Sequence, residues 1–352
     1  MTPRLDAPRP RWSRSLPPRL TSLAVLLLAG CGDAETFPQT ALDPRSDFAR
    51  SIDQLQDLTI YLGFAVGLLV FALLAYILVK FRYRPGSPEP QQVHGNARLE
   101  LAWTLLPALL VAVIAVPTVR VIFETQAEAP PNALTVDVIG WQWWWEFRYP
   151  VNGGRDTVVT ANEVHVPVGT PVQLRLHGGD IIHSFWIPQM GGKRDAIPGR
   201  VNRIVFTPQE PGIYLGACAE FCGESHALMK MRLVAHERAE FDEWLRSEAA
   251  PAREPTALTD SAVIVGRRLT VQGACAGCHV IRGTTAVGRA GPDLTHLARR
   301  TTIAAGILPN NAENLKRWID NPPAIKPGAK MPDLGLSEQD IEYIVAYLQT
   351  LY

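Results

Sequence analysis

The chain has almost no net charge and few cysteines, and both shortages exclude classes of protein. Its 34 basic residues balance 34 acidic residues over a length of 352, so no overall positive field favours nucleic acid as a partner. The five cysteines all lie in motifs with another chemical use, which leaves none for a structural disulfide. This length accommodates two or three domains. We therefore expect a multidomain protein that disulfides do not stabilise.

The N-terminus has the composition of an export signal. Five arginines precede an apolar run from Leu23 to Leu28 that is too short to span a bilayer, and small residues follow it. Leu28-Ala29-Gly30-Cys31 resembles a bacterial lipobox. We therefore predict a signal peptide of lipoprotein type over residues 1–30, with lipid attached to Cys31. An ordinary signal peptide with an incidental cysteine is the alternative.

Two later apolar runs are long enough to cross a membrane, Leu58–Val79 and Leu101–Val119. The second contains Pro107 and Pro117, which membrane helices tolerate. The connecting loop is basic, with Lys80, Arg82, Arg84 and Arg98. Basic loops stay in the cytoplasm. We therefore predict a two-helix transmembrane hairpin within residues 31–122, with everything after it outside the cytoplasm.

One short loop, Cys218–Met229, gathers soft metal ligands, and His183 lies upstream of it. Thiolate, imidazole and thioether donors suit copper, but a single blue copper uses only one cysteine. Two thiolates can instead bridge two copper ions, with His183 and His226 as nitrogen ligands and Met229 and the Glu220 carbonyl as weak axial donors. A disulfide between Cys218 and Cys222 is the alternative, and it leaves His226 and Met229 without a role.

The segment that contains these ligands is rich in short β-type runs. Between about residues 134 and 234 we expect strands at 135–139, 157–165, 171–176, 203–207 and 230–235, punctuated by glycine and proline. This pattern favours a β-sandwich or barrel that holds a metal site on its end loops. The run Trp141–Phe147 has more aromatic rings than one strand face can bury, so we expect at least one exposed ring.

The C-terminal part contains Cys275-Ala-Gly-Cys278-His279, a heme-attachment motif. The two thiols would form thioethers to the heme, and His279 would be one axial ligand. Met331 is the best second axial ligand, because methionine and histidine together are typical of cytochromes c; His296 is its rival. Helices are predicted over 260–272 and 337–351, the second with Ser337 as its N-cap. The module over 258–352 resembles a small class I cytochrome c, in which the Pro292 carbonyl would orient the proximal imidazole.

Five motifs recur together over about residues 50 to 240: Glu100-x-x-Trp103-Thr104-x-x-Pro107, Gln142-Trp143, His183-Ser184, Lys193–Arg200 and Cys218–Met229. Together they resemble subunit II of heme–copper cytochrome c oxidase. The resemblance implies a cupredoxin-like domain over 123–240 with a binuclear copper centre, CuA, held by the six donors named above. It also implies that electrons enter at Trp143, that Glu100 lies at a proton-path entrance, and that Glu220 binds a magnesium ion shared with the partner. Trp141 departs from the family, where many members have histidine.

We expect a linker over residues 241–257 to join the copper domain to the cytochrome c module. Together the two modules predict an electron-transfer subunit of a terminal oxidase that does not reduce oxygen by itself. The resemblance implies a catalytic subunit I and a subunit III as partners, an external electron donor, and a proton-translocating complex, or translocase. It implies a bacterial cell membrane with both redox domains on the periplasmic side. A copper subunit of a nitric oxide reductase remains an alternative. A copper chaperone would not need the heme, and quinol oxidases lose the copper ligands.

Overall fold

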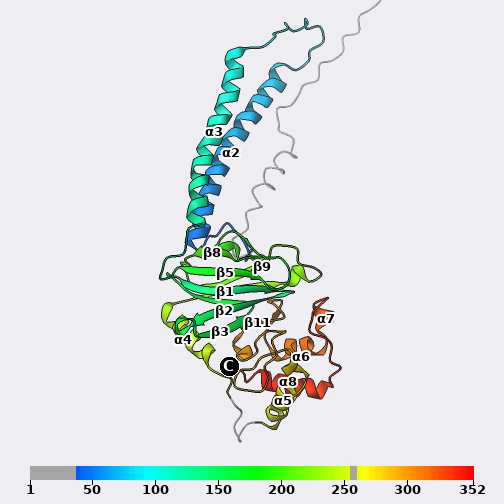
Figure 1. Cartoon of the computed structure of the whole chain (residues 1–352). Coiled ribbons are helices and arrows are strands. Elements are labelled where there is room, and N and C mark those ends of the chain that lie inside the picture. The colour runs from blue at the N-terminus through cyan, green and yellow to red at the C-terminus, as the bar shows by residue number, and fades with distance from the viewer. Residues whose placement is uncertain (1–36, 254–259) are drawn as a thin grey trace, which may run out of the picture. The chain divides into compact units, whose positions relative to one another are not determined.

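The first two helices that the structure describes form a hairpin. The structure, a computed structural model, describes residues 37–253 and 260–352, so the predicted signal peptide and Cys31 lie outside the described residues. Helices α2 (Asp47–Lys80) and α3 (Ala97–Thr125) run side by side (Figure 1). Both are long and apolar enough to cross a membrane, and their apolar windows are unburied. The two predicted membrane helices are therefore confirmed, and each extends beyond its apolar run.

Ten strands then form a sandwich of two five-stranded sheets. The first sheet has, in spatial order, β3 (Asp156–Ala161), β2 (Trp144–Val151), β1 (Leu134–Trp141), β5 (Val172–Gly178) and β8 (Asn202–Phe206). The second has β4 (Glu163–Pro167), β10 (Lys230–His236), β9 (Gly212–Cys218), β6 (His183–Trp186) and β7 (Arg194–Ala196). Alternate side chains point inward, as Val172, Leu174 and Leu176 do on β5. The predicted cupredoxin-like sandwich is thus present.

The predicted strand 157–165 is two strands in the structure. Asn162 separates β3 from β4 with φ 62°, a left-handed conformation that asparagine tolerates better than most residues. The break carries the chain from the first sheet to the second. Sequence patterning missed it because β-branched residues favour strand on both sides, Thr157–Thr160 before the break and Val164 and Val166 after it.

The predicted linker starts later than expected, because residues 238–249 form a helix, α4 (Arg238–Ala249). Phe241 of this helix is buried in the core of the sandwich. Trp244 stacks on the His165 ring, with 4.1 Å between ring centroids. The helix therefore belongs to the copper domain, and the connection to the next module begins at Ala250.

The C-terminal module is built around two helices that cross at a glycine. They are α5 (Ser261–Val271) and α8 (Glu338–Leu348), with Ser337 as the N-cap of α8 as predicted. A Cβ on Gly266 would lie 1.8 Å from the Tyr343 carbonyl oxygen, so only glycine permits this packing. The module also contains α6 (Ala312–Asp320), α7 (Pro322–Ile325) and a hairpin of β11 (Thr302–Ile303) and β12 (Leu308–Pro309). The predicted helical cytochrome c domain is confirmed, with a small hairpin added.

Candidate copper and heme sites

The predicted copper ligands meet because of strand order. Strands β6 and β9 are neighbours, and Phe185 pairs with Cys218, which brings His183 beside the end of β9. The ligand loop joins β9 to β10, and the Cys218 amide donates to the Met229 carbonyl across 2.9 Å. Both ends of the loop are thus fixed to the second sheet. The second sheet thus holds both the loop, which carries five of the six predicted copper donors, and His183 on β6.

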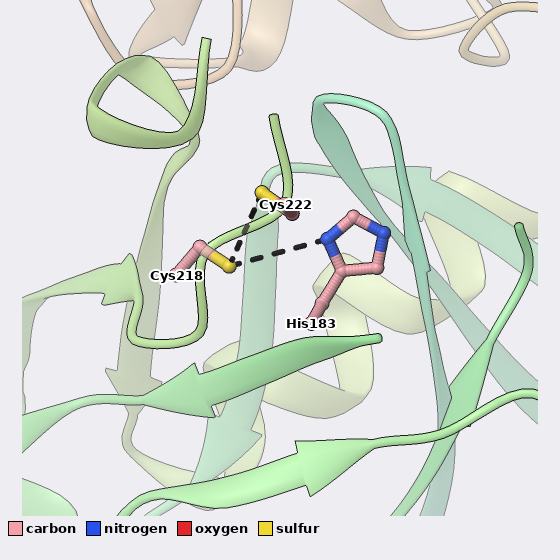
Figure 2. Close-up of side chains that lie close together, drawn as sticks. All are labelled: His183, Cys218 and Cys222. Atoms are coloured by element: carbon pink, nitrogen blue, oxygen red, sulfur yellow. Dashed lines mark hydrogen bonds between the residues drawn. The ribbon is translucent and has the colours of Figure 1, made fainter. Parts of the chain in front are cut away.

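The donor atoms lie close enough together to share metal ions. The Sγ atoms of Cys218 and Cys222 are 3.7 Å apart, and His183 Nδ1 lies 4.0 Å from Cys218 Sγ (Figure 2). Cys222 Sγ lies 3.5 Å from His226 Nδ1 and 3.9 Å from Met229 Sδ. The sixth predicted donor, the Glu220 carbonyl, is 3.3 Å from Cys218 Sγ. A disulfide needs sulfurs about 2.05 Å apart, so the structure does not support that alternative.

Neighbouring groups hold His183 with Nδ1 facing the sulfurs. Asp180 Oδ1 lies 2.9 Å from His183 Nε2, which leaves Nδ1 for a metal. A Cβ on Gly140 would lie 2.8 Å from His183 Cδ2, so this glycine lets the ring pack against the strand. Burial raises the pKa of Asp180, but hydrogen bonds from His183, Gln142 and Ile181 outweigh it and lower that pKa. Sequence reasoning missed Asp180, although a carboxylate three residues before a ligand is a usable signal.

The two thiols influence each other's protonation. The hydrogen bond between them lowers the pKa of Cys218 to about 3, against the effect of burial. The same contact raises the pKa of Cys222. Cys218 therefore loses its proton more readily than Cys222. Bound metal cations would favour the thiolate form of both, since metal ions bind thiolates and release protons.

Trp143 lies directly behind the copper loop. Its indole N–H donates to the Cys222 carbonyl across 2.8 Å, and the Gln142 side-chain amide donates to the same oxygen across 3.0 Å. Trp143 is only 9% exposed. The expectation of an exposed ring in this aromatic run is therefore wrong: Trp141 and Trp144 are half-buried and Trp145 is fully buried.

The two predicted carboxylates have different surroundings. Glu220 is exposed at the tip of the copper loop. Glu100 lies in the first turn of α3, where its Oε1 is 3.3 Å from the amide of Asn96. That contact is a helix cap. The magnesium role of Glu220 and the proton-path role of Glu100 stay predictions.

The residues predicted to attach and ligate heme line one apolar cavity of about 290 Å³. Cys275, Cys278, His279 and Met331 all line it. Its apolar lining includes Leu294, Leu315, Trp318, Ile319 and Leu348. Two thiols, an imidazole and a thioether around an apolar hollow are the chemistry that a covalent heme requires.

The imidazole of His279 is oriented as an iron ligand would be. Its Nδ1 donates to the Pro292 carbonyl across 2.8 Å, leaving Nε2 free to bind iron. A Cβ on Gly291 would lie 2.6 Å from His279 Cε1, so glycine makes room for the ring. Burial lowers the pKa of His279, partly offset by the Pro292 contact, and this favours the neutral form. The rival ligand His296 does not line the cavity, and its Nε2 lies 3.0 Å from the Ala250 carbonyl.

Family profiles match three successive segments of the chain. The transmembrane domain of cytochrome c oxidase subunit II matches residues 37–121, its periplasmic domain matches 151–236, and cytochrome c matches 263–352. The cytochrome c oxidase subunit 2 of Alkalihalophilus pseudofirmus is 40% identical, over 96% of this chain and 97% of that protein. Those of Bacillus sp. (strain PS3) and Bacillus subtilis are 35% and 33% identical, each over 94% of this chain and 96% of theirs.

Fold and sites define a membrane-anchored electron carrier with a copper domain and a cytochrome c domain in one chain. Its similarity extends over nearly the full length of these relatives. The chain therefore belongs to the cytochrome c oxidase subunit 2 family and is an electron-transfer subunit of an oxidoreductase complex. The matched domains imply CuA and heme c, association with other oxidase subunits, and an extracytoplasmic domain on a membrane anchor.

Proposed function

We propose that the chain relays electrons within a terminal respiratory oxidase. When bound, heme c would accept electrons from an external donor and CuA would pass them to the heme of the catalytic subunit, for reduction of oxygen to water. The observation that supports this most directly is the pair of sulfurs 3.7 Å apart, each contacted by a different histidine. Neither α2 nor α3 contains a histidine. Iron ligands for oxygen reduction would therefore come from the partner.

The chain's own residues would hold heme c and CuA and determine the path of the electrons between them. Cys275 and Cys278 would attach heme c, with His279 and Met331 on its iron. The six donors of the copper loop and β6 would hold CuA in a site where His183, Cys222 and Met229 are fully buried. Such burial excludes water and tunes a redox metal. Trp143 would connect the two sites, because its ring lines the heme cavity and its N–H contacts Cys222.

The remaining expectations complete the proposed assembly. We propose a catalytic subunit I and a subunit III as partners in a proton-translocating complex of the bacterial cell membrane, with both redox domains periplasmic. Exposed Glu220 would share a magnesium ion with subunit I, and Glu100 would lie at a proton-path entrance. Cys31 would carry the lipid of a processed lipoprotein. None of the relatives reported above is named as a nitric oxide reductase subunit, so we do not carry that alternative further.

Electron paramagnetic resonance and optical spectra of the purified full-length chain test this proposal, with copper and heme quantified. We expect two coppers per chain, a mixed-valence signal shared equally between them, and a low-spin c-type heme. Photoreduction of the heme should then be followed by appearance of reduced copper. A single blue copper, or an oxidised pair of cysteines without copper, would overturn the relay and leave a membrane-anchored cytochrome c.

A further inference from the structure

Besides the contacts that Arg282 and Arg299 make with α4, two segments of the heme module touch the copper domain beside the copper loop. The first is the hairpin segment 301–308, which includes β11 and contacts β4 and β10. The second is the segment 326–330, which leads into Met331 and contacts Trp143, Ser225 and Asp180. We name them the hairpin contact and the methionine-loop contact. Each contains a buried charged residue that the relay described above does not use.

Glu163 is the charged residue of the hairpin contact. It lies on β4 of the copper domain and is 1% exposed. Its Oε1 accepts hydrogen bonds from the amides of Thr301 at 2.9 Å and Thr302 at 3.1 Å. The hydroxyl groups of both threonines also donate to this oxygen. A buried carboxylate is costly unless hydrogen bonds satisfy it, and here the donors to Oε1 all belong to the other module.

The backbone of the same hairpin reaches the copper loop. Ala304, Ala305 and Gly306 have φ values of 55°, 62° and 82°, a left-handed turn that alanine rarely adopts. The Ala305 carbonyl accepts from the Lys230 amide across 3.0 Å, and Lys230 directly follows the copper donor Met229. A rarely adopted conformation persists where surrounding contacts determine it. The turn thus joins the hairpin to the residue next to a copper ligand.

Lys326 is the charged residue of the methionine-loop contact, and its side chain extends from the heme module into the copper domain. It is 4% exposed, and its Nζ donates to the Trp143 carbonyl and, at 3.5 Å, to the Ala304 carbonyl. Ser225, inside the copper loop, donates its hydroxyl to the Pro327 carbonyl. A Cβ on Gly328 would lie 2.8 Å from Trp143 Cη2, so the loop presses on the tryptophan ring. This loop is what covers Trp143.

We propose that Glu163 and Lys326 are positioning residues that latch the heme module onto the copper loop, and that the latched module closes Trp143 to external donors. This inference rests on the proposed relay. The two residues come from opposite modules. Glu163 accepts from Thr301 and Thr302 of the heme module, and Lys326 donates to the Trp143 carbonyl of the copper domain as well as to Ala304 of its own module. Such reciprocal contacts define one docked geometry rather than a sliding surface. An external protein donor would then have to deliver its electrons to the heme module.

The test uses the complete oxidase complex, with Glu163→Ala and Glu163→Gln in this chain. Glu237→Gln is the matched control, because Glu237 is an exposed carboxylate of the same domain. Hydrogen exchange should show faster exchange of the Thr301 and Thr302 amides, by at least about tenfold in the alanine variant, since hydrogen bonds to a charged acceptor are lost. Heme-to-copper transfer after photoreduction should slow by a similar factor. The heme spectrum, copper signal and both midpoint potentials should stay unchanged.

A second variant pair tests the latch from the heme module, in case the alanine variant folds poorly. Thr301→Val keeps the backbone donor and removes one hydroxyl. Its effect on the rate of heme-to-copper transfer should be non-additive with the effect of Glu163→Gln. Lys326→Met should allow an external soluble cytochrome to reduce copper directly. Unchanged exchange at residues 301 and 302, or unchanged transfer despite faster exchange, would overturn the latch. Absence of copper reduction in the wild-type complex would instead overturn the relay, so the two failures can be distinguished.

Discussion

The copper domain and the heme module hold their redox groups by different physical means. In the copper domain, strand pairing and hydrogen bonds place each donor: β6 pairs with β9, Asp180 orients His183, and Trp143 contacts the loop backbone. In the heme module, the attachment residues line an apolar cavity of about 290 Å³ between short helices and loops. The first site is therefore a product of the fold, whereas in the second the bound group is part of the hydrophobic core.

This difference predicts opposite responses to loss of the bound group. A sheet keeps its hydrogen-bond ladders whether or not a loop at its end binds metal. A small helical module cannot keep a core whose centre has been removed. Copper should therefore matter little for the folding of its domain, and heme should decide the folding of its module.

The largest expected effect is the loss of heme attachment. Cys275→Ser combined with Cys278→Ser should unfold residues 260–352 while the β-sandwich stays folded. An unfilled cavity destabilises by about 24 cal/mol per Å³, which for this cavity is on the order of 7 kcal/mol, comparable to the stability of a whole small domain. Hydrogen exchange resolved by segment measures both parts in one chain. Protection of α5 and α8 equal to that of the wild type would contradict the comparison.

A smaller effect is expected for the equivalent change in the copper domain. Cys222→Ser removes one bridging thiolate, so the mixed-valence copper signal should be lost and copper per chain should fall. The free energy of unfolding of the sandwich should change by only about 1–2 kcal/mol, because one buried side chain changes and no ladder hydrogen bond does. Metal analysis and exchange of the β9 and β10 amides measure the two consequences. Unfolding of the sandwich would show that the metal, not the sheet, organises this site.

The same contrast explains what the sequence could and could not reveal. Chemical identity is local: the Cys218–Met229 loop and Cys275–His279 each present their donors within a few residues, so both groups could be predicted from spacing. Positioning is local only in part. Asp180 lies three residues before His183 and could have been recognised from that spacing, whereas Glu163 and Lys326 acquire partners 138 and 183 residues away. The prediction of an exposed ring in the aromatic run was wrong for a related reason. The heme module covers Trp143, and the alternation of residues within one strand does not show that another module packs on it.

The next effect is on copper affinity, and it is expected when Asp180 can no longer orient His183 with a full negative charge. Asp180→Asn should reduce copper affinity by about 10- to 100-fold, as loss of such outer partners commonly does. Competition with a Cu(I) chelator measures this affinity. Asp180 also pairs with Lys330 at 3.3 Å, so Lys330→Met is the matched control, which removes that ion pair and keeps the histidine contact. Equal losses in both variants would assign the effect to the ion pair and contradict the orienting role.

The smallest expected effect concerns an ion pair on the first sheet of the sandwich, which contacts none of the predicted copper donors. Asp137 on β1 accepts from Arg175 on β5 through two hydrogen bonds of 2.7 and 2.6 Å, and His177 Nε2 lies 3.1 Å away. Burial raises the pKa of Asp137, but Arg175 and His177 outweigh it and the pKa is lowered. A lowered pKa stabilises the folded state above the unfolded value of about 3.9, and this stability is lost as pH falls through the folded value.

Asp137→Asn should therefore lower stability at neutral pH by no more than about 1 kcal/mol, because Arg175 is 40% exposed and solvent screens the pair. The seven residue pairs between β1 and β5 remain in the variant. The difference between wild type and variant should begin to shrink as pH falls below about 4, where the unfolded chain starts to bind the proton, and it should vanish below the lowered pKa of the folded state. Exchange of the β1 and β5 amides as a function of pH measures this difference. A difference that does not shrink as pH falls would mean that the side-chain amide disturbs packing, since a contribution from charge must be lost on protonation.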